Sequence, residues 1–429
     1  MPDTPDTMTP NTPPLLPLED ESGMYAELDP PPRLLMGPGP INADPRVLRA
    51  MGMPLLGQFD PLFRRYMKET MALYRRVFET RNDWTLLIDG SARAAIEALM
   101  ASAIEPGERV LVASFGRFGQ LMSEIARRIG AEVRVIEAPW GTVFPAEQIE
   151  QALKQYSPKL LAICQGDTST TMAQPLEDVG VLCRRHGALL QVDATATLGG
   201  MPLPVDEWHI DCATAGLQKC LAGPSGSAPV TFGDAMARTI YRRRHVEEGL
   251  RPAGYVAGEG RIIASNYFDV AMLMDYWGDR ALNHHTEATT MLYGARECAR
   301  ILVSEGLPQA FARHARASRA MVAGVEAMGL TVYGDKAHKM PNVTGVVIPD
   351  GISGDRVRAT LLSEHGIEIG SSFGPLHGKI WRIGAMGYNA REDAVLTTLA
   401  ALDSVLAAHG HRFSRSAGVD AARAAYALG

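Results

Sequence analysis

The sequence lacks several features that mark specialised classes of protein. It has only five cysteines among 429 residues, and none of them forms a C-x-x-C pair. Their number is odd and their flanks are apolar, so we expect buried free thiols in a reducing compartment such as the cytoplasm, not a disulfide framework. No run of 18 or more apolar residues free of charges occurs, which argues against a membrane-spanning helix.

A basic excess is also missing. Lysine and arginine together number 42 and aspartate and glutamate 48, which gives a formal net charge of −6 at pH 7. A general nucleic-acid-binding protein would normally carry a basic excess or stripe, and the basic run at Arg242–His245 is more typical of a solvated helix face. Apolar residues make up 46% of the chain and charged residues 21%, as in ordinary globular proteins. The length predicts two or three structural units.

Proline is concentrated at the start of the chain. Eleven of the 28 prolines fall in the first 40 residues, between Thr, Asp and Glu. Such a composition buries too little apolar surface to offset the entropy of ordering, so residues 1–33 are predicted to be a disordered tail. The tail has no basic segment followed by an apolar one and is therefore not predicted to be a secretory signal.

The globular part of the chain divides into two patterns. Between about residues 85 and 235, helical segments alternate with apolar runs at Thr85–Ile88, Arg109–Ala113, Glu132–Ile136, Leu160–Cys164, Ala188–Val192, Cys212–Ala215 and Ala228–Phe232. This alternation predicts an α/β fold around a mostly parallel sheet. After about residue 285, long helices precede short strands. We therefore predict a large domain over 34–285, a smaller α+β domain over 286–410 and an extension over 411–429, with a helix near 288–305 as the bridge.

A single lysine lies among apolar and small residues at Ala215–Cys220, before the loop Gly223–Gly226. Because lysine is rarely buried unless paired, Lys219 either reaches solvent or is held desolvated with a lowered pKa, a state that favours Schiff-base formation. Asp193 ends an apolar run, where ligands bind in open α/β sheets, although it could also be a helix N-cap. An Asp and a Lys one strand–loop–strand step apart suggest a pyridoxal phosphate site, since an Asp keeps the pyridine nitrogen protonated and a Lys carries the aldehyde as an imine.

A phosphate site is also expected. The residues Asp89–Arg93 follow one apolar run and open a predicted helix. Free N–H groups and the positive end of the helix dipole favour an anion there, and Ser91 and Arg93 can add a hydroxyl donor and a charge. The alternative is that Ser91 is a plain N-cap.

The order of seven motifs resembles that of the class V aminotransferases, in the alanine/serine–glyoxylate branch. The motifs are Gly90–Arg93, Phe115–Gln120, Gln165–Thr170, Val192–Asp193, Gln218–Lys219, His284–Thr286 and Trp381–Gly384, and the resemblance runs from about Leu34 to Leu406. It implies the fold type I of pyridoxal-phosphate-dependent transferases, with a large domain built on a mostly parallel seven-stranded sheet. It also implies the cofactor pyridoxal 5′-phosphate and a homodimer with its active site at the interface.

The resemblance implies a role for each matching residue. Lys219 would carry the cofactor and Asp193 would pair with its pyridine nitrogen. The other cofactor-binding residues are implied to be Ser91, Ala92, Arg93 and Gln218 at the phosphate, Phe118 stacked on the ring, Thr168 near the ring hydroxyl, and Thr286 at the phosphate of the other subunit's cofactor. Arg382 would clamp the substrate carboxylate through two parallel hydrogen bonds.

Two residues bear on the amino donor. Asn283 stands where alanine–glyoxylate enzymes have Tyr, and Gln58 lies in Gly57–Pro61, which with Gln165–Met172 is most similar to the ureidoglycine–glyoxylate group of purine catabolism. Two amides can donate to and accept from a ureido group, and a site built for that group penalises substrates without it. The resemblance thus implies ping-pong transfer from (S)-ureidoglycine to glyoxylate, giving oxalurate and glycine. Alternatively, either amide caps a loop or contacts phosphate.

Other interpretations stay open at this point. The same residues would serve a transaminase acting on alanine, serine or pyridoxamine, a class V lyase, or a binding protein that kept the fold without its activity. His284 and His285 suggest a metal, but no third His or Cys lies at ligand spacing, so no metal site is predicted. Cys220 is expected to be a core residue and not a desulfurase nucleophile.

Overall fold

The computed structural model describes residues 27–428. Most of the predicted tail, residues 1–26, lies outside the described residues, and 27–33 form an exposed segment without helix or strand. From Leu34 onward the chain forms one compact unit. None of the helices described is both long enough and apolar enough to cross a membrane. All five cysteines are buried and unpaired, as predicted.

A seven-stranded sheet lies at the centre of this unit, in the order β2–β10–β9–β8–β5–β3–β4. The strands are β2 (Trp84–Gly90), β3 (Arg109–Ser114), β4 (Glu132–Glu137), β5 (Leu160–Cys164), β8 (Leu189–Asp193), β9 (Cys212–Thr214) and β10 (Gly226–Phe232). β10 is antiparallel to both of its neighbours, and the other neighbouring pairs are parallel. The prediction of a mostly parallel sheet is confirmed.

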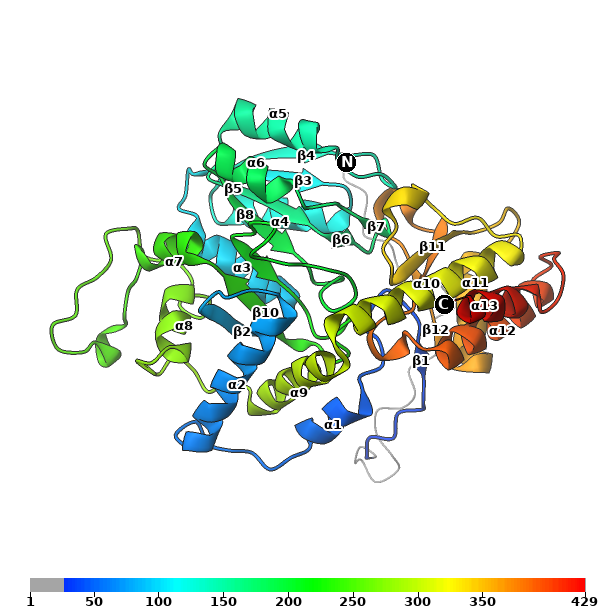
Figure 1. Cartoon of the computed structure of the whole chain (residues 1–429), viewed down its shortest axis with the longest axis horizontal. Helices are drawn as coiled ribbons and strands as arrows, with labels where there is room; N and C mark the ends of the chain where they lie inside the picture. Colours follow the sequence, from blue (N-terminus) through cyan, green and yellow to red (C-terminus); the bar gives the residue numbers. More distant parts are fainter. Residues whose placement is uncertain (1–26, 429) are drawn as a thin grey trace, which may run out of the picture. The chain divides into compact units, whose positions relative to one another are not determined.

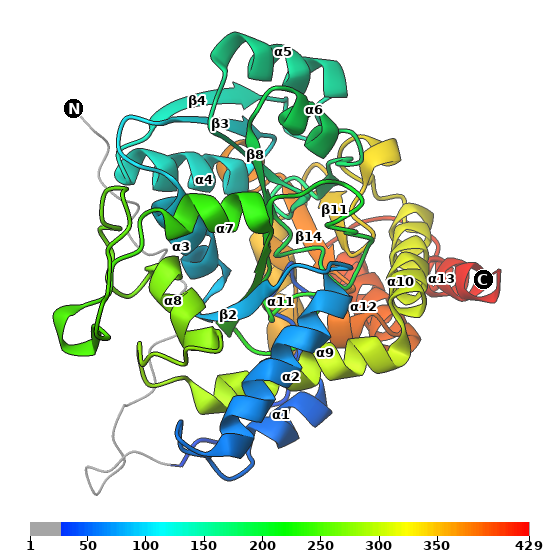
Figure 2. The same ribbon diagram turned by 60° about the vertical axis from the view of Figure 1, so that its left-hand side comes forward.

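Helices cover both faces of the sheet (Figures 1 and 2). Helices α3 (Ala92–Ala103) and α4 (Arg117–Arg128) pack together on one face, and α5 (Ala146–Tyr156) and α6 (Val179–Arg185) on the other. Crossovers between parallel strands are right-handed, so the direction in which the chain moves along the sheet decides which face the connecting helix covers. The chain moves toward the β4 edge through α3 and α4, and it moves back toward β8 through α5 and α6. Strands covered on both faces are apolar throughout, and residues 110–113 of β3 are fully buried.

Further helices pack near the β2 edge: α1 (Pro45–Met51), α2 (Pro61–Val77), α7 (Asp234–Tyr241), α8 (Val270–Trp277) and α9 (Thr289–Glu305). Of these, α2, α7 and α8 were not predicted from the sequence. α2 begins with a common helix-start signal. Asp60 is its N-cap, and the Asp60 carboxylate accepts a hydrogen bond of 2.8 Å from the N–H of Leu62. Pro61 occupies the first turn, where a backbone N–H would have no partner within the helix.

A second hydrophobic core lies around a three-stranded sheet in the order β11–β14–β13. Its elements are β11 (Val343–Val347), β13 (Gly370–Ser371), β14 (Ile380–Gly384), α10 (Leu307–Ala327), α11 (Gly354–His365), α12 (Glu392–Ala408) and α13 (Ala417–Ala427). Residues 331–333 contribute only one bridge, between Val332 and Val346. Within α10, Ala310 belongs to the hydrophobic core around the seven-stranded sheet, and Ala317 belongs to the second core. Helix α10 therefore joins the two cores. The predicted domain boundaries stay predictions.

Candidate active site

A cavity of about 320 Å³ lies at the carboxyl ends of the parallel strands, the edge where ligands bind in open α/β sheets. Eight of the residues expected to bind a cofactor line this cavity: Ser91, Ala92, Arg93, Phe118, Thr168, Asp193, Gln218 and Lys219. They come from five separate stretches of sequence, and the fold brings them together. Their individual roles stay predictions.

Lys219 lies in the loop after β9 with only 7% of its surface exposed. Its ammonium group donates a hydrogen bond to the carbonyl oxygen of Pro38. Gly39 adopts a φ of +99°, and a Cβ at that position would collide with the lysine side chain, so glycine is required there. Burial lowers the pKa of Lys219 to about 8, and the positive charge of Arg382 acts in the same direction. A substantial fraction of neutral, nucleophilic amine is therefore present close to neutral pH.

Asp193 is the last residue of β8 and is 4% exposed. Its Oδ1 accepts a hydrogen bond of 2.9 Å from the N–H of Thr195. Burial raises the pKa of Asp193, while the hydrogen bond from the Thr195 N–H opposes that rise. The Thr195 hydroxyl is itself buried without a hydrogen-bond partner, and Thr195 lines the cavity. A ligand that brings a cationic N–H to this end of the cavity would stabilise the carboxylate form.

The start of α3 forms a second end of the cavity. Ser91 is the N-cap residue, with an extended backbone, but its side chain makes no capping hydrogen bond. The Ser91 hydroxyl and the first N–H groups of the helix thus remain available for an anion, and the exposed Arg93 adds a positive charge. The cavity therefore pairs an anion-binding end with an acidic end. This arrangement fits the phosphate and the ring nitrogen of pyridoxal phosphate.

Arg382 lies on β14 beside the cavity wall but does not line the cavity in this structure. Its Nη1 donates to the carbonyl oxygen of Thr168 at 3.0 Å and its Nε to that of Ser371 at 2.6 Å. Burial lowers the pKa of Arg382 to about 10, so the guanidinium keeps its charge at neutral pH. This guanidinium lies 4.9 Å from the centre of the Phe373 ring, and the guanidinium of Arg117 lies 4.8 Å from the same ring centre.

Asp167 was given no role from the sequence, although it stands inside a recognised motif. It is fully buried at the end of β6 (Gly166–Asp167), and its Oδ2 accepts a hydrogen bond of 2.8 Å from the N–H of Phe118. A Cβ at Gly116 would collide with the same carboxylate. Asp167 therefore fixes the start of α4, which holds the Phe118 ring at the cavity. The available signal was an Asp in a run of Ser and Thr, typical of a cap, but its partner lies 49 residues away.

Pro38 and Gly39, in the sequence Gly37-Pro38-Gly39-Pro40, were given no role in the site from the sequence. In the structure, Gly39 lines the cavity and Pro38 accepts the hydrogen bond from Lys219. The Gly-Pro repeat was the signal for an unusual backbone, but nothing local connected it with a lysine 181 residues away.

Besides Arg382, three predicted residues lie outside the cavity of their own chain: Gln58, Asn283 and Thr286. Gln58 and Asn283 nevertheless meet, because Gln58 Nε2 donates to Asn283 Oδ1 at 3.4 Å across 225 residues of sequence. Asn283 and Thr286 are exposed and belong to an irregular segment, residues 283–288, that leads into α9. The resemblance assigned Thr286 to the other subunit's cofactor, so a position outside this cavity is what that assignment requires.

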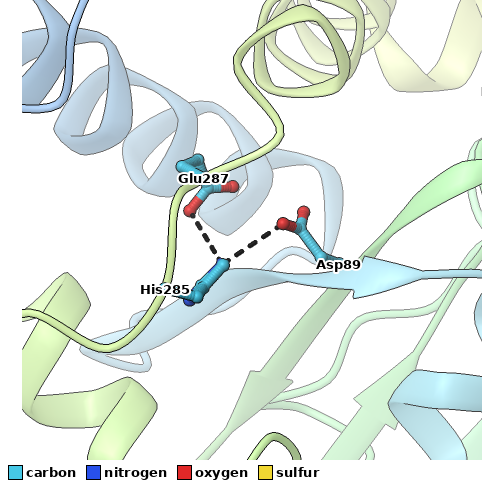
Figure 3. A group of neighbouring side chains, drawn as sticks. All are labelled: Asp89, His285 and Glu287. Atoms are coloured by element: carbon cyan, nitrogen blue, oxygen red, sulfur yellow. Dashed lines mark hydrogen bonds and ion pairs between the residues drawn. The ribbon is translucent and has the colours of Figure 1, made fainter.

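His285 of this segment lies among carboxyl groups (Figure 3). Its Nε2 is 3.2 Å from Asp89 Oδ2 and 3.7 Å from Glu287 Oε2. The sequence offered no third His or Cys as a metal ligand, whereas the structure brings two carboxyl groups to this histidine. Across residues 27–428 this is the one set of His, Cys, Asp and Glu side chains close enough together to hold a metal ion.

Comparison with known proteins agrees with this geometry. A family described as Aminotransferase class-V matches residues 56–393. An (S)-ureidoglycine–glyoxylate transaminase of Bacillus subtilis is 51% identical over 400 residues, which cover 93% of this chain and 95% of the relative. The crystal structure of a ureidoglycine–glyoxylate aminotransferase of Bacillus subtilis has a TM-score of 0.88 at 50% identity, with 94% of this chain and 100% of that one covered. An alanine–glyoxylate aminotransferase of Nostoc sp. has a TM-score of 0.84 at 38% identity, with 91% and 100% covered.

The family match spans far more than half of the chain, and the cavity contains the lysine, the acid and the anion-binding helix start that a pyridoxal phosphate site requires. The chain belongs to the class V aminotransferases and is a pyridoxal-phosphate-dependent transaminase.

Proposed function

We propose that this enzyme transfers the amino group of (S)-ureidoglycine to glyoxylate and releases oxalurate and glycine by a ping-pong mechanism. The observation that carries the proposal is the contact between the amides of Gln58 and Asn283. The similarity to the Bacillus subtilis transaminase, which is named for this substrate pair, supports it.

The amide pair is suited to a ureido group. Gln58 Oε1 is buried and has no hydrogen-bond partner, so it can accept from a ureido N–H, while an Asn283 N–H can donate to the ureido oxygen. Alanine offers neither group and would leave the buried amide oxygen unpaired. A site built for a polar substrate group discriminates strongly against substrates that lack it.

We propose further that the enzyme is a homodimer and that this amide pair serves the partner subunit's cavity. The support is that Gln58, Asn283 and Thr286 all lie outside the cavity of their own chain while the segment 283–288 exposes two of them. In a dimer with a two-fold axis, each subunit would contribute the same residues to the cavity of the other. The five unpaired thiols favour a reducing compartment, and we propose the cytoplasm.

The cofactor would be held at its two ends and across its ring. Ser91, Ala92 and Arg93 at the start of α3, together with Gln218, would bind the phosphate. Asp193 would face the ring nitrogen, Phe118 would pack on the ring, and Thr168 would lie near the ring hydroxyl. When bound, pyridoxal phosphate supplies an aldehyde that links covalently to amines and a ring that accepts the electron pair left when a Cα–H bond breaks.

The protein's own groups handle protons and substrate carboxylates. Lys219 Nζ would remove the proton from the donor's Cα and later deliver a proton to the α-carbon of glyoxylate, acting as base and acid in turn. Its pKa of about 8 suits a group that must do both near neutral pH. Arg382, held by the carbonyls of Thr168 and Ser371, would orient the carboxylate that both substrates share.

The test is a screen of amino donors in the first half-reaction. The enzyme is mixed with (S)-ureidoglycine, alanine, serine or pyridoxamine without glyoxylate, and the change in cofactor absorbance is followed for each donor. We expect ureidoglycine to react with the highest kcat/KM. Faster conversion by another donor would refute the proposed donor. A ping-pong transaminase releases at most one oxo-acid product per active site without glyoxylate, so repeated turnover under these conditions would indicate a lyase.

Asn283→Tyr is the matched variant. Removing one of the two amides should lower the ratio of ureidoglycine to alanine kcat/KM by at least about tenfold, as expected when a substrate group loses its partner. Gln151→Tyr, at an exposed amide of α5 that does not line the cavity, serves as the control. An unchanged ratio in Asn283→Tyr would contradict the role of the amide pair.

A further inference from the structure

The segment 283–288 is attached to the main sheet at one point. Asp89 lies near the end of β2. Its Oδ2 accepts a hydrogen bond of 3.2 Å from the N–H of Ala288 and also lies 3.2 Å from Nε2 of His285. Asp89 also stands two residues before Ser91, the N-cap of α3. The same carboxylate therefore contacts the segment that exposes Asn283 and Thr286 and adjoins the phosphate-binding end of the cavity (Figure 3).

The surroundings of this contact are nearly dry. The side chains of Asp89, His285 and Glu287 are 11%, 10% and 2% exposed. His285 Nδ1 lies 2.8 Å from Nδ1 of His284, which in turn contacts the carbonyl of Asn266 at 3.3 Å. Hydrogen bonds are stronger in such surroundings than in water, so those of this cluster limit the number of conformations that the segment can adopt. Asp89 Oδ1 and Glu287 Oε2 are buried without a hydrogen-bond partner.

The two carboxyl groups are not equivalent. Burial raises the pKa of Glu287 well above its usual value, and the charge of Asp89 adds to the rise. Asp89 Oδ2 accepts the two hydrogen bonds to the segment, whereas Glu287 Oε2 lies 3.7 Å from His285 and has no hydrogen-bond partner. Loss of the Asp89 carboxylate should consequently matter more than loss of the Glu287 carboxyl group.

We propose that Asp89, His285 and Glu287 are positioning residues that fix segment 283–288 against the end of β2 and thereby set the positions of Asn283 and Thr286. The proposal deepens the proposed function, because it rests on those two residues completing the partner subunit's site. Through this cluster, the phosphate-binding end of one cavity is connected with the segment that would complete the other.

The test uses the holoenzyme and three near-isosteric variants, Asp89→Asn, His285→Gln and Glu287→Gln. His186→Gln is the matched control, since His186, the residue after α6, also lies beside a carboxylate, at 3.3 Å from Glu150 of α5, and does not line the cavity. The measurements are the dissociation constant of pyridoxal phosphate, KM and kcat for the amino donor, and the melting temperature. The metal content after incubation with Zn²⁺ or Mn²⁺ is determined for each protein.

For Asp89→Asn and His285→Gln we expect the cofactor dissociation constant and the donor KM to rise about tenfold, the effect of one lost charge-assisted hydrogen bond, while kcat at saturation changes little. Glu287→Gln should give a smaller rise of about twofold, and His186→Gln none. A fall in melting temperature with unchanged dissociation constant and KM would show a merely structural role and overturn the proposal, as would failure of both main variants to fold.

Two further results keep the alternatives apart. Binding of one metal ion per chain, lost in Asp89→Asn, would overturn the positioning role in favour of a metal site made of one His and two carboxylates. If ureidoglycine proves not to be the donor but Asp89→Asn still weakens cofactor binding, the proposed donor fails while the positioning role stands, since the dissociation constant does not depend on the donor.

Discussion

At the scale of single residues, Lys219 depends on its surroundings for its reactivity. A free lysine is almost fully protonated at neutral pH, and the loss of water around Lys219 reverses part of that preference. The neighbouring Arg382 adds repulsion between like charges, so the residue expected to bind the substrate carboxylate also helps to free the amine. If Arg382 binds the substrate carboxylate as predicted, one buried positive charge serves both substrate binding and the reactivity of Lys219.

This coupling predicts how cofactor uptake depends on pH. Only the neutral amine attacks an aldehyde, and the pKa of Lys219 is about 8. The rate at which apoprotein takes up pyridoxal phosphate should therefore rise with pH up to about 8 and level off above it. In Arg382→Gln, loss of the neighbouring charge favours the ammonium form, so the plateau should begin at higher pH. Stopped-flow absorbance at a series of pH values measures both curves.

Arg391→Gln is the control for that comparison, because Arg391 pairs with Asp393 and lies outside the cavity. Its curve should match that of the unaltered protein. A plateau in Arg382→Gln that begins at the same or a lower pH would show that Arg382 does not depress the lysine pKa.

At the scale of elements, local sequence signals predicted the sheet well. Buried parallel strands are continuous apolar runs, so β3 and β5 begin at the predicted residues. Helices were predicted less completely. Every residue of α8 is buried, acidic Asp275 included, and a helix that is covered on all sides has no amphipathic period to reveal it. α2 begins at Asp60–Pro61, a start signal that was considered only as part of a substrate-binding motif.

The residues of the candidate site likewise differ in how far the sequence could predict them. Asp193 and Lys219 could be found because each follows an apolar run and the ends of neighbouring strands meet. The contact of Gln58 with Asn283 and that of Asp89 with His285 could not be predicted. Both depend on the path of irregular segments that have no period and cross about 200 residues of sequence. The order of family motifs identified His284–Thr286, but not what the segment packs against.

The C-terminal helix α13 shows how glycine permits close packing. Gly418 of α13 and Gly324 of α10 face each other, and a Cβ on Gly418 would collide with Met328 and approach the carbonyl oxygen of Gly324 to 2.9 Å. Gly418→Val should therefore lower the free energy of unfolding by about 1–3 kcal/mol, the usual cost of overpacking. Urea unfolding measures the change.

Ala424→Val is the matched control, on the exposed side of the same helix, where β-branching alone should cost less than about 0.7 kcal/mol. The cofactor absorbance of both variants should stay unchanged, because α13 lies outside the cavity. Equal stability of the two variants would contradict the close packing of α13 on α10.

At the scale of the whole molecule, the net charge gives little information about the ligand. The chain carries a formal charge of −6, yet its cavity combines the start of α3 and Arg93, with the charged Arg382 beside its wall. Under the proposed function, a phosphate and two carboxylate substrates would be bound by local positive potential in an acidic protein. The net charge argued against nucleic acid as a partner. Which small molecules bind depends instead on the charged groups around the cavity.

Shared sites in a homodimer have a consequence that no monomeric site would have. Lys219→Ala should abolish turnover, and Asn283→Tyr should transfer little from ureidoglycine. In a mixed dimer, however, the Asn283→Tyr subunit keeps Lys219 and would receive an intact Asn283 from the Lys219→Ala subunit. That one cavity is then complete.

Co-expression of the two variants with different affinity tags tests this. Random association makes about half of the dimers mixed, each with one complete cavity out of two, so the unfractionated mixture should recover about a quarter of the normal ureidoglycine activity. Mixed dimers purified through both tags should reach about half. Separately purified proteins combined without subunit exchange supply the baseline. If the purified mixed dimer shows no more than the average of its two parents, Asn283 acts within its own subunit and the shared site is wrong.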